Sequence, residues 1–403
     1  MKNIKSLARI YALKNAVAHG GKAQAGAVIS GLFAEGLKKS DVGKYVKEIS
    51  EIVKEINALE SEEQKILFEK HEGEISEREV REGLPELPGA KKGKVIMRFA
   101  PSPSGGLHIG HALTASLSIL YVNKYGGKFV CRIEDTNPEN IYPPAYKLIE
   151  KDIKWLSKNN VDVEIQSDKM ENYYSYSEKL IKKGAAYVCT CSQEGFKKFS
   201  EEKKNCPCRD LGIKENLGRW KKMLAKEGFK VGEAVLRFKT PEGMTHPNPA
   251  MRDFPLARIN LGKHARQKNK YRVWPLMNLS VTVDDIEMKM THIIRAKEHR
   301  DNAQRQKMIY KVLGKDYPWE AYLGRWKFKD MELSASQITK DIGTGKYSGW
   351  DDPRLPTLAS LRKRGYKPEA FWKIAEQRGL SEVDKVIDKK DFFELLDRMN
   401  KNL

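Results

Sequence analysis

V-I-M-R-F-A-P-S-P-S-G-G-L-H-I-G-H-A-L, residues 95–113, is the stretch on which the interpretation of this chain depends. The apolar run 95–97 predicts a buried strand, the prolines and glycines of 101–106 end it, and apolar residues at helical spacing follow over 112–122. Strand, Gly/Pro turn and helix form the first half of a nucleotide-binding βαβ unit, whose helix N-terminus offers free backbone N–H groups to a phosphate. The stretch therefore predicts a nucleotide site in an α/β fold.

Two histidines, His108 and His111, stand at the start of the predicted helix. Their i, i+3 spacing places both imidazoles on one side of its first turn, with Gly110 between them. Ring N–H groups there can stabilise charge that grows on a phosphate, and a glycine lets a flat base or ribose lie against the backbone. Neither a Walker A loop nor a G-x-G-x-x-G fingerprint is present, which disfavours P-loop NTPases and Rossmann oxidoreductases. The alternative is a pair of ordinary surface or core histidines.

Composition indicates a soluble protein with a polyanionic partner. A chain of 403 residues has room for two or three domains, and 74 Lys and Arg against 54 Asp and Glu give a net charge of +20. Such an excess favours a nucleic acid, most simply RNA, bound through its phosphates. No run is long enough for a membrane span, and five cysteines do not make a disulfide scaffold. We expect a cytoplasmic protein without a membrane partner.

R-F-A-P-S-P-S-G, residues 98–105, followed by H-I-G-H, residues 108–111, resembles the signature of class I aminoacyl-tRNA synthetases. Along essentially the whole chain the sequence is similar to archaeal-type glutamyl-tRNA synthetases. The resemblance implies ATP-dependent attachment of L-glutamate to tRNA(Glu), and possibly to tRNA(Gln), through a glutamyl-adenylate, with Mg²⁺ on the phosphates.

The same resemblance implies a Rossmann-like catalytic domain, an inserted acceptor-stem-binding domain and a helical C-terminal stem-contact region. Helical periodicity before the signature predicts an appended N-terminal helical domain with a basic face, followed by a linker rich in Pro, Gly and Lys. We expect residues 251–259 and 271–285 to return the chain to the main sheet. The predicted boundaries are 1–83 for the N-terminal domain, 84–94 for the linker, 95–184 and 250–324 for the two catalytic halves, 185–249 for the insertion and 325–403 for the signature loop and stem-contact region.

The predicted glutamate site combines one carboxylate with two arginines. Glu134 follows the apolar strand 129–133, and ligands of open α/β sheets bind beyond that end of the strands, so it is placed to take the α-ammonium group. Arg98 and Arg295 can each grip a carboxylate bidentately. The resemblance implies these roles and adds Ser102. The alternatives are a solvated carboxylate for Glu134 and structural ion pairs for the arginines.

The predicted ATP site departs from the family pattern in one place. Other branches carry K-M-S-K-S or K-L-S-K-R where this chain has M-E-L-S-A-S-Q, residues 331–337, so Ala335 replaces the lysine that meets the phosphates. We expect His108, His111 and Lys340 to serve as the catalytic groups instead. The ATP-binding residues that the resemblance implies are Ser104, Gly105, His108, Gly110, His111, Ser334 and Ser336.

Four of the five cysteines form two C-x-C pairs, Cys189 with Cys191 and Cys206 with Cys208. Together they supply the four sulfur ligands of a tetrahedral structural zinc site. The spacing is tighter than the usual C-x₂₋₄-C knuckle, and the alternative is a set of reduced thiols in a loop-rich insertion.

The C-terminal region carries the predicted tRNA contacts. G-W-D-D-P-R, residues 349–354, and the basic run 362–364 resemble the stem-contact region of the family. The residues expected to meet tRNA phosphates are Arg354, Arg362, Lys363 and Arg364. The alternative is an ordinary solvated basic helix. No barrel-like alternation follows residue 393. Either the anticodon-binding β-barrels of the relatives lie on a separate chain, or the enzyme works without anticodon contacts, or this sequence is a fragment. We expect a monomer.

Three rival functions remain open at this stage. Two are enzymes of the same fold, a glutaminyl-tRNA synthetase and a shortened relative that glutamylates a modified tRNA base. The third is a non-catalytic tRNA-binding subunit of a split synthetase, suggested by Ala335 and the missing barrels. The intact set of predicted site residues disfavours the third, because a binding subunit needs no ATP pocket.

Overall fold

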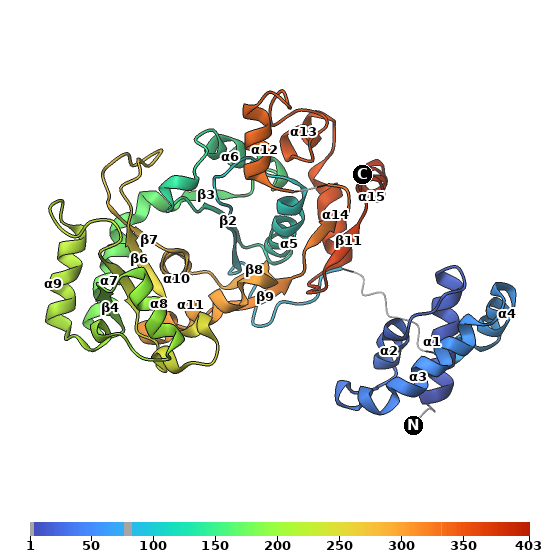
Figure 1. Cartoon of the computed structure of the whole chain (residues 1–403). Coiled ribbons are helices and arrows are strands. Elements are labelled where there is room, and N and C mark those ends of the chain that lie inside the picture. Colours follow the sequence, from blue (N-terminus) through green and yellow to red (C-terminus); the bar gives the residue numbers. More distant parts are fainter. Residues whose placement is uncertain (1–3, 76–82, 332) are drawn as a thin grey trace. The chain divides into compact units, whose positions relative to one another are not determined.

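The computed structural model describes residues 4–75, 83–331 and 333–403 (Figure 1). Residues 1–3, 76–82 and 332 lie outside it; they include the end of the predicted N-terminal domain and one position of the predicted signature loop. The chain divides into two compact units, 1–82 and 83–403. No helix in the described ranges is long and apolar enough to cross a membrane.

The first unit is a set of helices packed around α1. Its core uses residues at three- and four-residue spacing, as in Ile49, Ile52, Val53 and Ile56 of α3. Residues 4–75 carry equal numbers of basic and acidic side chains, so the net positive charge of the chain lies elsewhere; the basic face expected for this domain stays a prediction. Its elements are α1 (Ile4–Ala18), α2 (Ala25–Ala34), η1 (Lys39–Asp41), α3 (Val42–Asn57), α4 (Ser61–His71) and η2 (Glu72–Glu74).

The second unit contains the predicted parallel sheet. β1 pairs with β2 and β2 with β3, all parallel, and β8 pairs in parallel with β9. The two groups join where the N–H of Thr291 donates to the carbonyl of Ile96 (3.0 Å), next to the first residues of β8 and β1. The strand order is therefore β3-β2-β1-β8-β9, with a topological switch between β1 and β8. The strands are β1 (Ile96–Phe99), β2 (Lys128–Ile133), β3 (Asp162–Ile165), β8 (His292–Ala296) and β9 (Trp319–Leu323).

The helix predicted after the Gly/Pro turn is confirmed as α5 (Ile109–Tyr125), which packs its apolar face on β1. It ends at Gly126, whose φ of 67° is the left-handed conformation that favours glycine at a helix C-terminus. The other elements around the sheet are η3 (Pro138–Asn140), α6 (Ala145–Leu156), η4 (Gln166–Lys169), α7 (Met170–Lys182), η8 (Lys297–His299) and α11 (Arg300–Leu313).

The inserted domain extends further than predicted. β4 (Ala186–Cys189), β5 (Val235–Phe238), β6 (Pro255–Ile259) and β7 (Val273–Pro275) form one antiparallel sheet. The expectation that residues 251–259 and 271–285 return to the main sheet at residue 250 is therefore wrong. The strands of both segments pair within the insertion, and the chain returns through α10 (Met277–Glu287). The remaining elements of the insertion are α8 (Gln193–Glu201), η5 (Pro207–Asp210), α9 (Ile213–Leu224), η6 (Gly243–Thr245) and η7 (Pro249–Met251).

The C-terminal region shares a core with the parallel sheet. Phe371 and Ile374 of α14 and Phe392 of α15 belong to the same buried cluster as Leu113 of α5. This region is thus packed onto the predicted catalytic domain. Its elements are β10 (Trp326–Phe328), α12 (Ala335–Gly343), α13 (Leu358–Lys363), α14 (Pro368–Arg378), β11 (Lys385–Ile387) and α15 (Lys389–Lys401).

The predicted linker is tied to the end of α5. Leu87 is 4% exposed, and its N–H donates to the Tyr125 hydroxyl (3.0 Å). The N–H of Gly93 donates to the Tyr125 carbonyl (2.7 Å), and Lys124 Nζ donates to the carbonyl of Leu84 (3.0 Å). Residues 84–94, most of them exposed, are therefore anchored at three points to the end of α5 before they reach β1.

A buried cluster of charges joins β1, β2 and α10. Arg132 is fully buried; it donates to Asp285 through Nη1 (2.6 Å) and to Glu134 through Nη2 (3.0 Å). Arg98 grips the same Asp285 carboxylate through Nε and Nη2 (2.7 and 3.0 Å). Burial alone raises the pKa of the Asp285 carboxyl, but the two guanidinium groups hold it well below its usual value. The cluster fixes the relative positions of the three elements that border the predicted site.

Asp285→Ala should lower the free energy of unfolding by about 3–5 kcal/mol, because it leaves two guanidinium groups buried without their shared counter-charge. The matched control is Asp168→Ala, which removes the exposed 2.7 Å pair with Arg266 and should cost about 1 kcal/mol or less. Urea unfolding of both variants measures the difference. Equal losses in the two variants would contradict a central role for the buried cluster.

Candidate active site

A hollow of about 320 Å³ opens beyond the carboxyl ends of β1, β2 and β8. This is the switch point of the sheet, where α/β folds bind their ligands. The structure brings together here three of the four residues predicted to bind glutamate; the fourth, Ser102, is exposed and does not line the hollow in the described structure. The polar and charged side chains of its lining are Arg98, His111, Thr114, Glu134, Arg295, His299 and Gln306.

The two arginines of this hollow are engaged differently. Arg98 uses Nε and Nη2, the side-on edge of its guanidinium, to hold Asp285, which matches the structural ion pair considered as its alternative. Arg295 is 7% exposed and donates Nη1 to Gln306 Oε1 (3.0 Å), while its Nε and Nη2 are buried without a hydrogen-bond partner. Unpartnered buried donors are costly. The free edge of Arg295 therefore suits a carboxylate ligand, which would supply both missing acceptors.

Glu134 is oriented by Arg132, a residue that the sequence analysis did not single out. Arg132 donates to Oε1 of Glu134 through both Nε (3.3 Å) and Nη2 (3.0 Å), so Oε2 is the oxygen left for a ligand. The one sequence signal for Arg132 is a charged residue inside the otherwise apolar strand F-V-C-R-I, which a buried strand tolerates only with partners.

A second hollow of about 260 Å³ adjoins the first and shares Thr114 and Ala296 with it. It lies at the N-terminus of α5, with His108 and Gly110 on one wall. Arg325 and Arg378, both absent from the predicted site, belong to its lining. They follow β9 and end α14, and no motif in the sequence marks them as site residues.

His108 and His111 stack on each other, with ring centroids 3.8 Å apart. The backbone N–H of His108 donates to Nδ1 of His111 (3.3 Å), so the ring proton of a neutral His111 sits on Nε2. Burial lowers the pKa of both, that of His111 to about 4 and that of His108 well below its usual value, where the neighbouring imidazole adds to the effect. The pair therefore offers neutral N–H donors and contributes no positive charge near pH 7.

The stretch that replaces the family's lysine-bearing loop lies against the Gly/Pro turn. Ser334 begins α12, and its Oγ accepts from the N–H of Gln337 (3.3 Å). Thr339 of the same helix donates to the carbonyl of Ser104 (3.0 Å). A Cβ at Gly105 would lie 2.5 Å from the Trp350 ring, so this position requires glycine.

The remaining predicted ATP ligands are placed differently from one another. Ser336 and Lys340 are exposed on α12 and line neither hollow in the part of the chain that the structure describes. The structure thus places Ser104 and Gly105 beside Thr339 and Ala335 of α12, and leaves Ser336 and Lys340 at the surface.

The four residues predicted to contact tRNA phosphates have different partners. Arg362 donates to the buried carboxylate of Asp152 (3.0 Å), so it is a structural ion pair, and Lys363 pairs with Asp351 (2.8 Å). Arg354 is held by Asp352 through Nε and Nη2 (2.9 and 2.7 Å).

Arg364 and Arg354 share a surface hollow that the sequence did not indicate. It measures about 420 Å³ and is also lined by Lys389 and Lys390 at the start of α15. Arg364 lies over the ring of Phe393 in its wall. The basic surface is therefore assembled from segments distant in sequence, and only part of it comes from the run 362–364.

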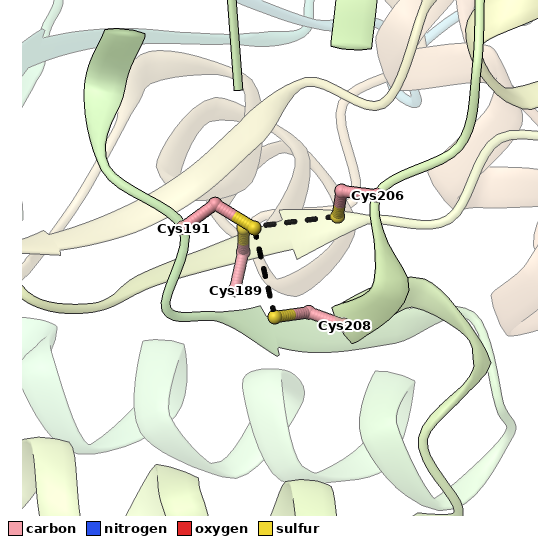
Figure 2. Close-up of side chains that lie close together, drawn as sticks. All are labelled: Cys189, Cys191, Cys206 and Cys208. Carbon is pink, nitrogen blue, oxygen red and sulfur yellow. Dashed lines mark hydrogen bonds between the residues drawn. The ribbon is translucent and has the colours of Figure 1, made fainter. Parts of the chain in front are cut away.

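The four cysteines of the insertion converge, as predicted for a metal site (Figure 2). Their sulfur atoms all lie within 4.8 Å of one another; Cys189 and Cys206 are 3.8 Å apart, and Cys191 and Cys208 are 3.9 Å apart. Hydrogen bonds lower the pKa of the Cys206 thiol to about 6, and the bond from Cys189 has the largest effect. One thiolate therefore forms readily. Four sulfurs at these distances fit a tetrahedral Zn–S₄ centre with no position left for a substrate.

Comparison with known proteins identifies the family of this chain. Residues 94–400 match the catalytic domain of the tRNA synthetases class I (E and Q). The chain is 43% identical to the glutamate–tRNA ligase of Methanobrevibacter smithii, over 98% of this chain and 71% of that protein. It is 44% identical to the glutamate–tRNA ligase of Pyrococcus abyssi, over 95% of this chain and 68% of that protein.

A solved structure shows the same fold. The glutamate–tRNA synthetase of Elizabethkingia anophelis superposes with a TM-score of 0.54 at 22% identity, over 77% of this chain and 70% of that chain. At that identity the likeness speaks for the fold alone.

The neutral histidine pair predicts a specific dependence of stability on pH. Both imidazoles have a pKa in the folded state below that in the unfolded chain, about 6.5, so unfolding takes up protons in acid. Stability contributed by the pair is present above pH 6.5 and is lost as the pH falls towards 4. The double variant His108→Asn/His111→Asn should show a smaller loss of unfolding free energy between pH 7.5 and pH 5 than the wild type. A larger loss in the variant would mean that the pair is protonated in the folded protein.

Proposed function

The chain belongs to the class I tRNA synthetases of the glutamate and glutamine branch and to its glutamate–tRNA ligases, and from this membership we propose how its residues divide the reaction. The enzyme attaches glutamate to tRNA at the expense of ATP. The first hollow receives glutamate and the second receives ATP. The observation that carries this assignment is the open edge of Arg295, buried beside a hollow that continues to the histidine pair.

In the first hollow, Arg295 takes the side-chain carboxylate of glutamate through Nε and Nη2. Glu134 takes the α-ammonium group through Oε2, the oxygen that Arg132 leaves unused. Arg98 keeps Asp285 and offers its remaining Nη1 to the substrate. Ser102, at the exposed turn, is retained as a substrate contact only from the family pattern. One carboxylate and two guanidinium groups complement an amino acid with one ammonium and two carboxylates.

In the second hollow, the α-carboxylate of glutamate attacks the α-phosphorus of ATP, which forms the mixed anhydride glutamyl-adenylate and releases pyrophosphate. His108 and His111 donate hydrogen bonds to the phosphate oxygens, and Gly110 leaves room for the nucleotide. Mg²⁺ neutralises the phosphates. A terminal ribose hydroxyl of tRNA then attacks the acyl carbon, and AMP leaves.

The cation missing at Ala335 is supplied in this proposal by Arg325, which lines the second hollow. In this proposal ATP is also contacted when the start of α12 moves over the Gly/Pro turn, by Ser104, Gly105, Ser334 and Ser336. Lys340 is a further candidate for the missing cation and requires the same movement. Arg325 already lines the hollow, where its Nε pairs with Glu298 (2.6 Å), and in this proposal it exchanges that partner for a phosphate.

tRNA is bound by the basic surface of the C-terminal region. One hollow of this surface is lined by Arg354, Arg364, Lys389 and Lys390. Lys363, the residue before Arg364, is exposed. Arg362 supports this surface through Asp152 without meeting a phosphate. tRNA(Gln) is proposed as a second substrate beside tRNA(Glu).

The rival functions differ in what they require of the first hollow. A glutaminyl enzyme needs a partner for an amide, whereas Arg295 presents two parallel donors that suit a carboxylate. A tRNA-binding subunit needs no buried unpartnered donors at all. The open guanidinium therefore favours the glutamate-activating enzyme over both.

ATP–pyrophosphate exchange tests the proposed function. Exchange should depend on glutamate, with glutamine and aspartate inactive, and should be stimulated by added tRNA. His111→Asn should lower the rate about 10²–10³-fold, the usual effect of removing one donor to transition-state charge. The exposed His19→Asn serves as the matched control and should leave the rate unchanged. Exchange driven by glutamine, or an active His111→Asn variant, would overturn the assignment.

We also propose a structural zinc ion on Cys189, Cys191, Cys206 and Cys208. Metal analysis should find about one zinc per chain, and Cys206→Ser should lose it together with thermal stability of the insertion. Cys131→Ala, which changes a buried cysteine of β2, is the control that should keep the metal. A metal-free chain whose melting temperature does not respond to chelator would refute the site.

A further inference from the structure

Gln306 is the side chain that holds Arg295 in place. It lies on α11, is 1% exposed and lines the glutamate hollow. Its Oε1 accepts from Nη1 of Arg295 (3.0 Å) and lies 3.4 Å from the hydroxyl of Tyr317. The hydroxyl of Tyr317 also lies 3.1 Å from a carboxylate oxygen of Glu320. Glu320 in turn forms an ion pair with Lys307 (2.5 Å). Among the described residues, Gln306 is the only hydrogen-bond partner of the Arg295 guanidinium.

The chemistry of the two groups fixes which way the amide of Gln306 faces. A guanidinium has five donors and no acceptor, so only the amide oxygen can face Nη1 of Arg295. The amino group then points away from Arg295. Because an amide is neutral, it satisfies this donor without cancelling the positive charge of the guanidinium, as a carboxylate at the same position would.

With Nη1 held, the side-on edge of Arg295 is the part of the guanidinium that remains for a ligand. The same edge grips both oxygens of a carboxylate elsewhere in this chain. Arg98 holds Asp285 at 2.7 and 3.0 Å, and Arg354 holds Asp352 at 2.9 and 2.7 Å. A carboxylate offers two acceptors to this edge. A carboxamide offers one acceptor and one donor, and its donor would face an N–H group.

We propose that Gln306 is a positioning residue that sets the preference for glutamate over glutamine, by fixing the guanidinium of Arg295 with its side-on edge free and its charge uncompensated. This inference rests on the proposed function of the first hollow. It adds to that function a residue that does not touch the reacting atoms and acts through Arg295.

Two variants separate position from charge. Gln306→Met keeps the length of the side chain and removes the acceptor, so the guanidinium loses its anchor. Gln306→Glu keeps the acceptor and adds a negative charge beside the site. Gln304 lies on the same helix and is exposed, so Gln304→Met and Gln304→Glu are matched controls.

The measurement is tRNA-stimulated ATP–pyrophosphate exchange with varied glutamate, glutamine and ATP. Gln306→Met should raise the KM for glutamate about tenfold, with kcat and the KM for ATP little changed. Gln306→Glu should raise the KM for glutamate further and should narrow the ratio of kcat/KM between glutamate and glutamine, because the added charge repels a carboxylate more than an amide. Both Gln304 variants should match the wild type.

The outcomes distinguish this inference from the function on which it rests. If the wild type shows no glutamate-dependent exchange, the proposed function is wrong and the inference falls with it. If the wild type is specific for glutamate but both Gln306 variants keep its KM and selectivity, the inference alone is overturned. A uniform rise of all KM values with a lower melting temperature would assign Gln306 a merely structural role and would also overturn it.

Discussion

The pairing of Arg132 with Asp285 is the constraint on which the first hollow depends. A guanidinium that is fully buried persists only if its charge is matched, and the matching carboxylate lies 153 residues further along the chain. Since the inserted domain lies between the two residues, the catalytic sheet completes its charge pairing only when α10 has returned from the insertion. The position of Arg98 and the orientation of Glu134 both follow from this one cluster.

Burial also determines what the signature histidines can do. The stacked rings of His108 and His111 are neutral near pH 7, so in the proposed ATP site they would stabilise a phosphate through hydrogen bonds and leave its charge to be balanced by other groups. In other branches of the family the loop resembled by residues 331–337 carries a lysine for that purpose, and here the corresponding position is Ala335. The proposed use of Arg325 follows from this, because it brings a permanent charge to the wall shared with His108.

Local sequence patterns predicted the parts of the structure that local physics determines. The strand, Gly/Pro turn and helix over 95–122 are confirmed as β1 and α5, and the C-x-C pairs do converge. Long-range pairing was not accessible in this way. The end of the insertion was misplaced because an apolar strand does not reveal which sheet it joins. The ion pair of Arg362 was not foreseen because Asp152, its partner, lies 210 residues away.

The contrast between Arg98 and Arg295 shows how one residue type serves two purposes in a single crevice. Both guanidinium groups are almost fully buried, and both border the same hollow. The side-on edge of Arg98 faces a carboxylate of the protein, so it is satisfied before any ligand arrives. Arg295 donates only Nη1 to a protein group, the neutral amide of Gln306. Its Nε and Nη2 stay without a partner, and its positive charge is not cancelled by that neighbour. Whether the side-on edge of an arginine is occupied by the fold or left open for a ligand is thus decided here by whether its neighbour is an Asp or a Gln.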